Sequence, residues 1–310
     1  MTRPDFPKTI FEFQKWFPNE ESCLKFLIRS RWPDGFVCPR CSNKEYYWIN
    51  TRKLLQCKKC GYQSSITAGT VMHRSRMPLT TWFQAAYLST THTPGISALQ
   101  FQRQVGLPTY RTAFQMLHKL RAATVSPSRS KLSGIVEVDE TYIGGAKPGK
   151  RGRGALGKCI VIGAVDTKGK YANRIRFRVI LNVSSSTLTN FVKANVEKAS
   201  TVITDDWQGY SGLTRLGYNH IIQLKLPHIH RAFSNLKTWI LGTHHGAIKP
   251  QHLQAYLNEY VFRFNRRKTP MAAFQIVLGL SSQRLGPTYK GLYGVAKDGS
   301  WEHPANPFVS

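Results

Sequence analysis

The sequence is poor in acidic side chains and has no long apolar run. Only 16 Asp and Glu residues stand against 44 Lys and Arg residues in 310 positions. No stretch reaches the roughly eighteen apolar residues that a transmembrane helix needs, which excludes a membrane span. The segment that follows Asp5 also lacks the apolar core of a secretory signal. We therefore expect a cytoplasmic protein, and at 35.2 kDa one larger than a single ordinary domain.

The shortage of acids leaves a formal net charge of +28. Such an excess favours a polyanion as partner, because each phosphate that a basic side chain neutralises releases condensed counterions. Nucleic acid is the leading candidate. Net charge alone does not distinguish a protein that binds nucleic acid from one that is only basic. The sequence motifs are needed to choose between these two interpretations.

Cysteine is scarce too, and four of the six cysteines form two close pairs. In a reducing compartment, paired cysteines favour a metal over disulfides. A Cys-x-x-Cys turn places two thiolates on one metal, and a returning hairpin supplies the other two. Four unrelated cysteines would rarely show this spacing. The sequence therefore predicts a zinc ribbon over residues 34–70, with one structural Zn²⁺ held by Cys38, Cys41, Cys57 and Cys60.

Helical patterns flank the ribbon. Residues 1–33 predict two short helices broken at Pro18, with Ser22 as the N-cap of the second. Residues 78–125 predict a helix-turn-helix-like module, in which Ser97 caps one helix, Gly106 allows the turn and Pro108 opens the next helix. A plain helical hairpin is the alternative. The last helix would contact DNA through Arg111, Lys119 and Arg121.

A polar linker at 126–133 precedes a change of pattern, and a tail follows at 283–310. Between them, residues 134–282 show three apolar strands, a helix at about 186–199 and a short strand at 201–204. Strand, strand, strand, helix, strand is the ribonuclease-H order. We predict an α/β fold: a ribonuclease-H-like catalytic domain with a mixed five-stranded sheet and helices, behind the ribbon and the helical module.

Two carboxylates in this pattern predict a metal site. Asp139 lies on the first strand and Asp205 at the end of the fourth, positions that face each other on adjacent strands. Cleavage and transfer of phosphodiesters use two divalent cations about 4 Å apart, and carboxylates suit such hard ions. Acids at strand ends are often only turn formers, but two on neighbouring strands point to function. Glu140 and Asp206 are second choices, because strand alternation turns Glu140 to the opposite face.

The third ligand is open. In the helix predicted from 227 to 241, His230 and Lys237 share one flank, so they would present a metal ligand and a phosphate contact together. Asn235 falls on the other flank, beside Trp239. Among the few acids after Asp206, Glu259 is the only plausible carboxylate.

The whole chain, over about residues 10–280, resembles the zinc-ribbon insertion-sequence DDE-type transposases of the IS1595, or ISXO2-like, family. The segments that carry the resemblance are the two cysteine motifs, Val138–Gly145, Thr204–Tyr210, Leu236–Lys237, Gly242–Gly246, His252–Tyr260 and Arg263–Arg267.

The resemblance implies a transposase that binds the terminal inverted repeats of an insertion sequence and catalyses DNA cleavage and strand transfer with two Mg²⁺ or Mn²⁺ ions. It implies metal binding by Asp139 and Asp205 and a role for Lys237. Its third catalytic position falls on His230, where most relatives have Glu and some have Asn or His; Asn235 is the alternative. Imidazole is a softer ligand than carboxylate, so we expect a weaker preference for Mg²⁺.

The family also implies partners: double-stranded DNA from the element ends and the target, and a homodimer or higher oligomer, in a bacterial or archaeal cytosol on the nucleoid. The run Arg263, Arg266 and Arg267 would hold DNA backbone, unless it is only a solvated helix end. Two other functions remain open. One is a catalytically inactive DNA-binding regulator derived from a transposase, and the other is a nuclease that cuts without joining.

Overall fold

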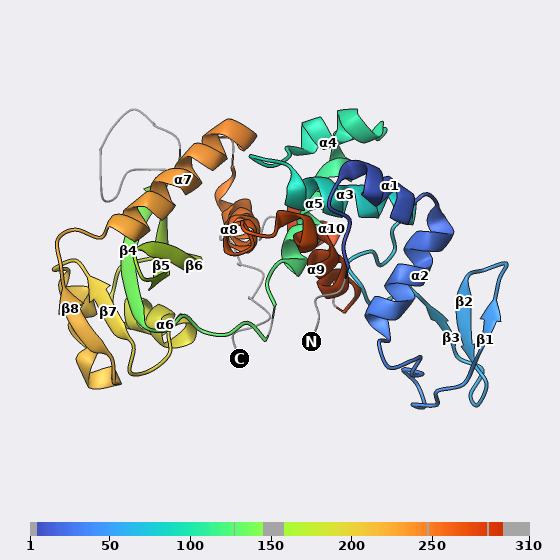
Figure 1. Cartoon of the computed structure of the whole chain (residues 1–310), viewed down its shortest axis with the longest axis horizontal. Helices are drawn as coiled ribbons and strands as arrows, with labels where there is room; N and C mark the ends of the chain where they lie inside the picture. Colours follow the sequence, from blue (N-terminus) through green and yellow to red (C-terminus); the bar gives the residue numbers. More distant parts are fainter. Residues whose placement is uncertain (1–4, 127, 145–157, 247, 284, 294–310) are drawn as a thin grey trace. The chain divides into compact units, whose positions relative to one another are not determined.

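The computed structural model describes residues 5–126, 128–144, 158–246, 248–283 and 285–293. They form two compact units, each described here by itself (Figure 1). Unit 1 combines the described parts of Met1–Ser126 and Thr269–Gly294, and unit 2 comprises those of Pro127–Lys268. Most of the tail predicted at 283–310 lies outside the described residues. No helix of the described chain is long and apolar enough to cross a membrane.

Unit 1 is a helical body with a small sheet. Its helices are α1 Ile10–Trp16, α2 Glu20–Arg31, α3 Leu79–Thr91, α4 Ala98–Val105, α5 Tyr110–Ala123, α9 Pro270–Ser282 and α10 Tyr289–Tyr293. The antiparallel strands β1 Tyr46–Ile49, β2 Leu54–Cys57 and β3 Gln63–Ser65 make up the ribbon sheet.

Two helix starts in unit 1 differ from the sequence prediction by a few residues. Asn19, not Ser22, caps α2: its side chain accepts from Ser22 N, and Ser22 completes the capping box as the third helical residue. Thr109 caps α5, so Pro108 precedes the cap instead of opening the helix. Ser97 and Gly106 take their predicted places, Ser97 as the N-cap of α4 and Gly106 left-handed at φ 69° after its last turn.

An aromatic cluster holds unit 1 together and includes a helix from far along the chain. Phe13 stacks on Tyr87 of α3 with ring centroids 4.3 Å apart, and Phe274 of α9 lies edge-on to both. The sequence prediction assigned 269–282 to the catalytic domain. Instead α9 packs on α3, because it buries Ala273, Phe274, Val277 and Leu278 there.

Unit 2 is built on the predicted five-stranded mixed sheet. Its strands are β4 Ile135–Ile143, β5 Cys159–Lys168, β6 Tyr171–Ile180, β7 Thr201–Thr204 and β8 Asn219–Ile222, in the order β6-β5-β4-β7-β8. β4, β5 and β6 form an antiparallel meander, whereas β7 and β8 run parallel to β4. This order and these directions are those of a ribonuclease-H-like fold.

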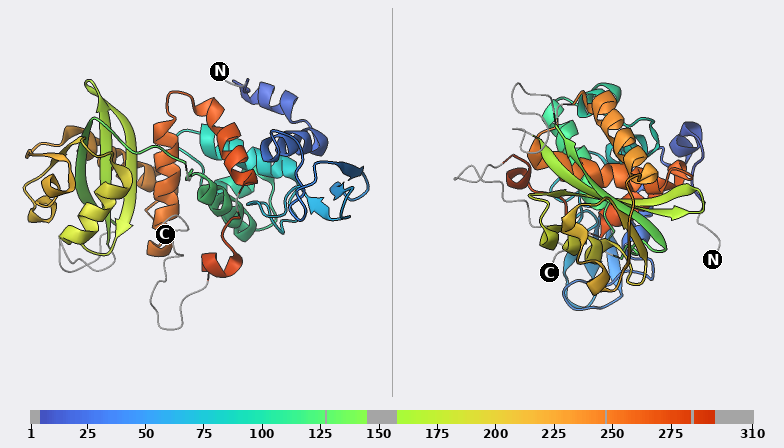
Figure 2. Two further views of the ribbon diagram at one scale, coloured as in Figure 1. Left: turned by 90° about the horizontal axis from the view of Figure 1, so that it is seen from below. Right: turned by 90° about the vertical axis from the view of Figure 1, so that its left-hand side faces the viewer.

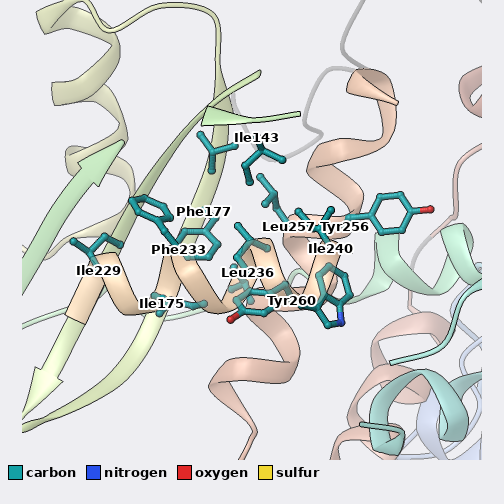
Figure 3. Close-up of a cluster of buried hydrophobic side chains, with 14 of the residues drawn as sticks. Ile143, Ile175, Phe177, Ile229, Phe233, Leu236, Ile240, Tyr256, Leu257 and Tyr260 are labelled. Carbon is teal, nitrogen blue, oxygen red and sulfur yellow. The ribbon is translucent and has the colours of Figure 1, made fainter. Parts of the chain in front are cut away.

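Helices cover both faces of this sheet (Figure 2). On one face α7 (Pro227–His244) and α8 (Pro250–Asn265) bury an apolar cluster that includes Phe177, Phe233 and Leu236 (Figure 3). On the other face α6 (Ser185–Asn195) packs Leu188 and Phe191 on the strands. The two clusters use alternate residues of each strand, so the neighbours of a side chain show which face it occupies.

Side chains of α8 form hydrogen bonds with backbone groups along the free edge of β6. Gln254 Oε1 accepts from Val179 N at 2.9 Å, and Asn265 Oδ1 accepts from Ile175 N at 2.8 Å. Asn265 Nδ2 also donates to Ile175 O. These amides take the place of a further strand, so the edge of β6 is not available for pairing.

Candidate active site

The four ribbon cysteines converge. Their sulfur atoms all lie within 4.8 Å of one another, with Cys38 to Cys60 at 3.6 Å and Cys41 to Cys57 at 3.5 Å. A tetrahedral ion with Zn–S bonds of about 2.3 Å needs sulfurs roughly 3.8 Å apart, so the set fits zinc. Four protein ligands leave no open coordination position, and the metal would be structural.

Of the two predicted aspartates, Asp139 lies on β4 and Asp205 directly follows β7, the parallel strand beside it. Glu137 pairs with Ile203, and continuing this register brings Asp139 level with Asp205 just after β7. The charge of Asp205 acts on Asp139. Asp205 Oδ1 accepts from Trp207 N at 3.2 Å, which fixes its carboxylate at the strand end.

The electrostatics of the pair disfavour the charged form of Asp139. Burial raises the pKa of Asp139 above its ordinary value, and the negative charge of Asp205 raises it further. The N–H of Glu140 and the ring of His230 act in the opposite direction without outweighing these effects. Within the described residues, the four cysteines are the only group with three or more potential ligand atoms all within 4.8 Å of one another. The ligand atoms of Asp139, Asp205 and His230 are therefore spread more widely than those of the zinc site. Two facing carboxylates with hard oxygen donors fit a divalent cation between them.

The described structure brings His230 to this pair. His230 Nε2 lies 3.1 Å from Asp139 Oδ2. Lys237 is exposed two turns further along α7, on the same flank as His230 and about 10 Å away by helix geometry. Asn235 is also exposed but lies on the other flank. Glu259 is buried on α8, where its carboxylate lies 4.0 Å from Arg263 Nη1.

A residue that the sequence reading did not single out anchors α7 to β4, the strand that carries Asp139. Glu137 of β4 is 5% exposed, and its Oε2 accepts from both His228 N and Ile229 N at 2.9 Å. These are first-turn N–H groups of α7, which has no side-chain cap of its own. The carboxylate also complements the positive end of the helix dipole. The sequence signal that could have identified Glu137 is its position two residues before Asp139, which places both side chains on the same face of the strand.

The opposite face of the sheet carries supporting contacts. Glu140 Oε2 accepts from Tyr210 OH at 2.8 Å, so Glu140 faces α6, as strand alternation predicted. Thr204 Oγ1 donates to Asp205 O and bonds to His220 Nε2, both at 2.8 Å. These contacts brace the backbone next to both aspartates.

Several basic residues predicted to contact DNA are engaged within the fold. On α5, Arg121 is 3% exposed and Lys119 Nζ donates to His73 O, so only Arg111 of that set is exposed. On α8, Arg263 is mostly buried beside Glu259, and Arg266 lies over the Phe262 ring at 4.0 Å. Arg267 donates to Ala172 O and Asn173 O of β6. The run at 263–267 therefore joins α8 to the sheet instead of forming a free stripe.

Fold and site together define a ribonuclease-H-like domain that follows a zinc ribbon. Comparison with protein families agrees: the ISXO2-like transposase domain matches residues 131–265, and the transposase zinc-ribbon domain matches residues 18–63. The chain belongs to the IS1595, ISXO2-like, family of transposases.

A comparison with curated proteins finds no match. Among solved structures, the chain is similar to one in the simian T-cell lymphotropic virus intasome with PP2A regulatory subunit B56 gamma. The identity is 15%, over 58% of this chain and 65% of that one, with a TM-score of 0.32. This chain thus spans less than two thirds of that protein. A pre-cleavage Mos1 transpososome matches at 10% identity over 61% and 75% of the two chains, with a TM-score of 0.24.

Proposed function

We propose that this transposase binds the terminal inverted repeats of its insertion sequence and catalyses both DNA cleavage and strand transfer. One observation carries the proposal. Asp139, on the central strand of the sheet, lies close enough to Asp205 for the charge of Asp205 to raise its pKa, and it contacts His230 of α7. The family match supports the reaction class.

In this proposal Asp139, Asp205 and His230 hold the catalytic metal. Bound Mg²⁺ or Mn²⁺, two ions in all, would activate the attacking oxygen and stabilise the leaving oxygen of an in-line displacement. Lys237 is exposed on the flank of α7 that carries His230, where its ammonium group binds a DNA phosphate and positions the strand. Glu137 keeps that flank aligned with β4 through the first turn of α7.

Unit 1 supplies DNA binding in the same proposal. The ribbon exposes Lys44, Arg52, Lys53, Lys58 and Lys59, and α5 exposes Arg111. Lys58 Nζ also lies 5.3 Å from the centroid of the exposed Tyr47 ring. A basic surface with aromatic side chains suits a duplex end, because phosphates and bases both find contacts there. Synapsis of two ends requires a dimer or a larger assembly.

The test is cleavage and joining of a labelled duplex that carries the element's inverted repeat, in Mg²⁺ or Mn²⁺. Asp139→Ala, Asp205→Ala and His230→Ala are expected to lose both steps by at least about a hundredfold. Asn235→Ala, on the other flank of α7, is the matched control and keeps both activities.

Each failure has a distinct meaning. A native protein that binds the repeat but never cuts it is a regulator. One that cuts without joining is a nuclease. If Asn235→Ala is inactive and His230→Ala is active, the third ligand is Asn235.

A further inference from the structure

Arginines crowd one edge of unit 2 and have too few acids for their number. β6 carries Arg174, Arg176 and Arg178, the segment before β4 adds Arg129, and α8 adds Arg266. The pKa of Arg176 is lowered to about 10, first by burial and then by the charges of Arg129 and Arg174, and Arg266 contributes in the same direction. Desolvation and then the charge of Arg178 lower the pKa of Arg129, although that residue as a whole is exposed. The five guanidinium groups therefore form one cluster, named here the β6 arginine cluster.

Among the described residues, one carboxylate, that of Asp166, faces this cluster, and it is occupied by Arg174 alone. Asp166 is 2% exposed and accepts from Arg174 Nε at 2.9 Å and from Nη2 at 2.6 Å. Arg176 donates to two backbone carbonyls, Ile175 O and Ser130 O, which carry no charge. The contacts of Arg266 are likewise uncharged, to the ring and carbonyl of Phe262. About four positive charges stay uncompensated.

Two members of the cluster reach outward. Arg129 is exposed and Arg178 is half-buried, and within the described residues neither has a hydrogen-bond or ion-pair partner. Packing therefore does not explain their presence. Like charges at this density repel one another unless an anion neutralises them, and a row of phosphates would do so.

The β6 members of the cluster lie on the face of the sheet away from Asp139. Phe177 points into the α7 side and Ile180 into the α6 side, so Arg176 and Arg178 share the α6 side with Ile180. Asp139 lies on the α7 side with His230. DNA placed with one phosphate at Asp139 would reach Arg178 only by passing round the β6 edge, which α8 covers.

We propose that the β6 arginine cluster binds the backbone of a second duplex segment, distinct from the segment held at Asp139 and Asp205. Its ligand class is the phosphodiester backbone, read without base specificity, because guanidinium groups bind phosphate through paired N–H donors. The assignment to a second segment rests on the proposed function. We assign that segment to the target duplex.

The first experiment measures binding to a duplex without inverted repeats by fluorescence anisotropy, using the zinc-loaded full chain over a range of salt. The variant is Arg129→Gln with Arg178→Gln, and the matched control is Lys198→Gln with Arg215→Gln, which removes two charges from exposed positions of the same unit. Losing two phosphate contacts lowers the slope of log K against log salt by about 1.8 and weakens binding roughly tenfold. Equal behaviour of the two double variants overturns the proposal.

The second experiment separates the cluster from the active site. The cluster variant is expected to cut an inverted-repeat duplex within about twofold of the native rate, and to join it to a separate target duplex roughly tenfold less efficiently. Equal losses in cutting and joining overturn the assignment to a second segment. If the native protein neither cuts nor joins, the proposed function fails, whereas the anisotropy result still decides whether the cluster binds DNA.

Discussion

Glu137 offers the sharpest test of how unit 2 holds α7, the helix that carries His230. In Glu137→Ala, the N–H groups of His228 and Ile229 lose the carboxylate that accepts from both at 2.9 Å. Each buried donor left without a partner costs about 1–3 kcal/mol. Relief from burying a carboxylate offsets part of this, because Glu137 is only 5% exposed. We expect a net loss of about 3 kcal/mol in the free energy of unfolding of unit 2.

Glu137→Gln keeps one neutral acceptor and loses the charge, so its expected cost is smaller, about 1–2 kcal/mol. For a unit of this size 1 kcal/mol corresponds to about 3 °C, which predicts shifts in Tm of about 9 °C for Ala and 3–6 °C for Gln. Differential scanning calorimetry of the full chain measures both. Glu197→Gln, an exposed change in the same unit, should stay within about 0.5 kcal/mol.

The same variants should weaken Mn²⁺ binding, because His230 lies one residue beyond the anchored N–H groups. An Ala variant whose unfolding free energy stays within about 0.5 kcal/mol of the native value would falsify the anchoring argument.

Three further outcomes follow from the described contacts. His230→Glu should raise the ratio of Mg²⁺-supported to Mn²⁺-supported cleavage, because a carboxylate is the harder ligand; an unchanged ratio removes His230 from the metal site. Asp139→Asn, measured with zinc bound but without added Mg²⁺ or Mn²⁺, should stabilise unit 2 in urea, because burial and Asp205 disfavour the charged form of Asp139, and it should abolish cleavage when the metal is added; a loss of stability contradicts this. For Glu20, burial acts to raise the pKa, but hydrogen bonds from Thr80 and Leu79 outweigh it, so the pKa is lowered from 4.5. The charged Glu20 side chain therefore stabilises unit 1 fully above its pKa in the unfolded chain, and this stabilisation is lost as the pH falls through its lower pKa in the folded protein. Between these two pKa values, acid unfolding of the native protein and of Glu20→Gln should differ.

The sequence predicts the position of a side chain well where the spacing between residues along a turn, strand or helix determines which side chains lie together. Cys-x-x-Cys pairs place thiolates on one metal, and alternation along β4 separates Asp139 from Glu140, so the ribbon and the faces of these two residues were predictable. Helical spacing also placed His230 and Lys237 on one flank.

Tertiary partners could not be read in the same way. Whether Arg121 or Arg267 is available to DNA or is engaged within the fold depends on which element packs beside it. The sequence shows an arginine in either case, so it cannot distinguish the two. The role of Glu137 depends on α7 starting directly above β4, although 91 residues of sequence separate Glu137 from His228. The placement of α9 depends on a match between Phe274 and aromatic rings near the N-terminus.

The return of α9 to unit 1 has a consequence for synthesis on the ribosome. The aromatic cluster around Phe13 and Tyr87 lacks Phe274, and Val71 N lacks its acceptor Ser281 O, until the whole of unit 2 has been translated. In the sequence, unit 2 is an insertion between the two parts of unit 1. A fragment that stops after α5 lacks Phe274 and leaves this apolar surface of α3 open, so premature termination of synthesis yields an incomplete unit 1.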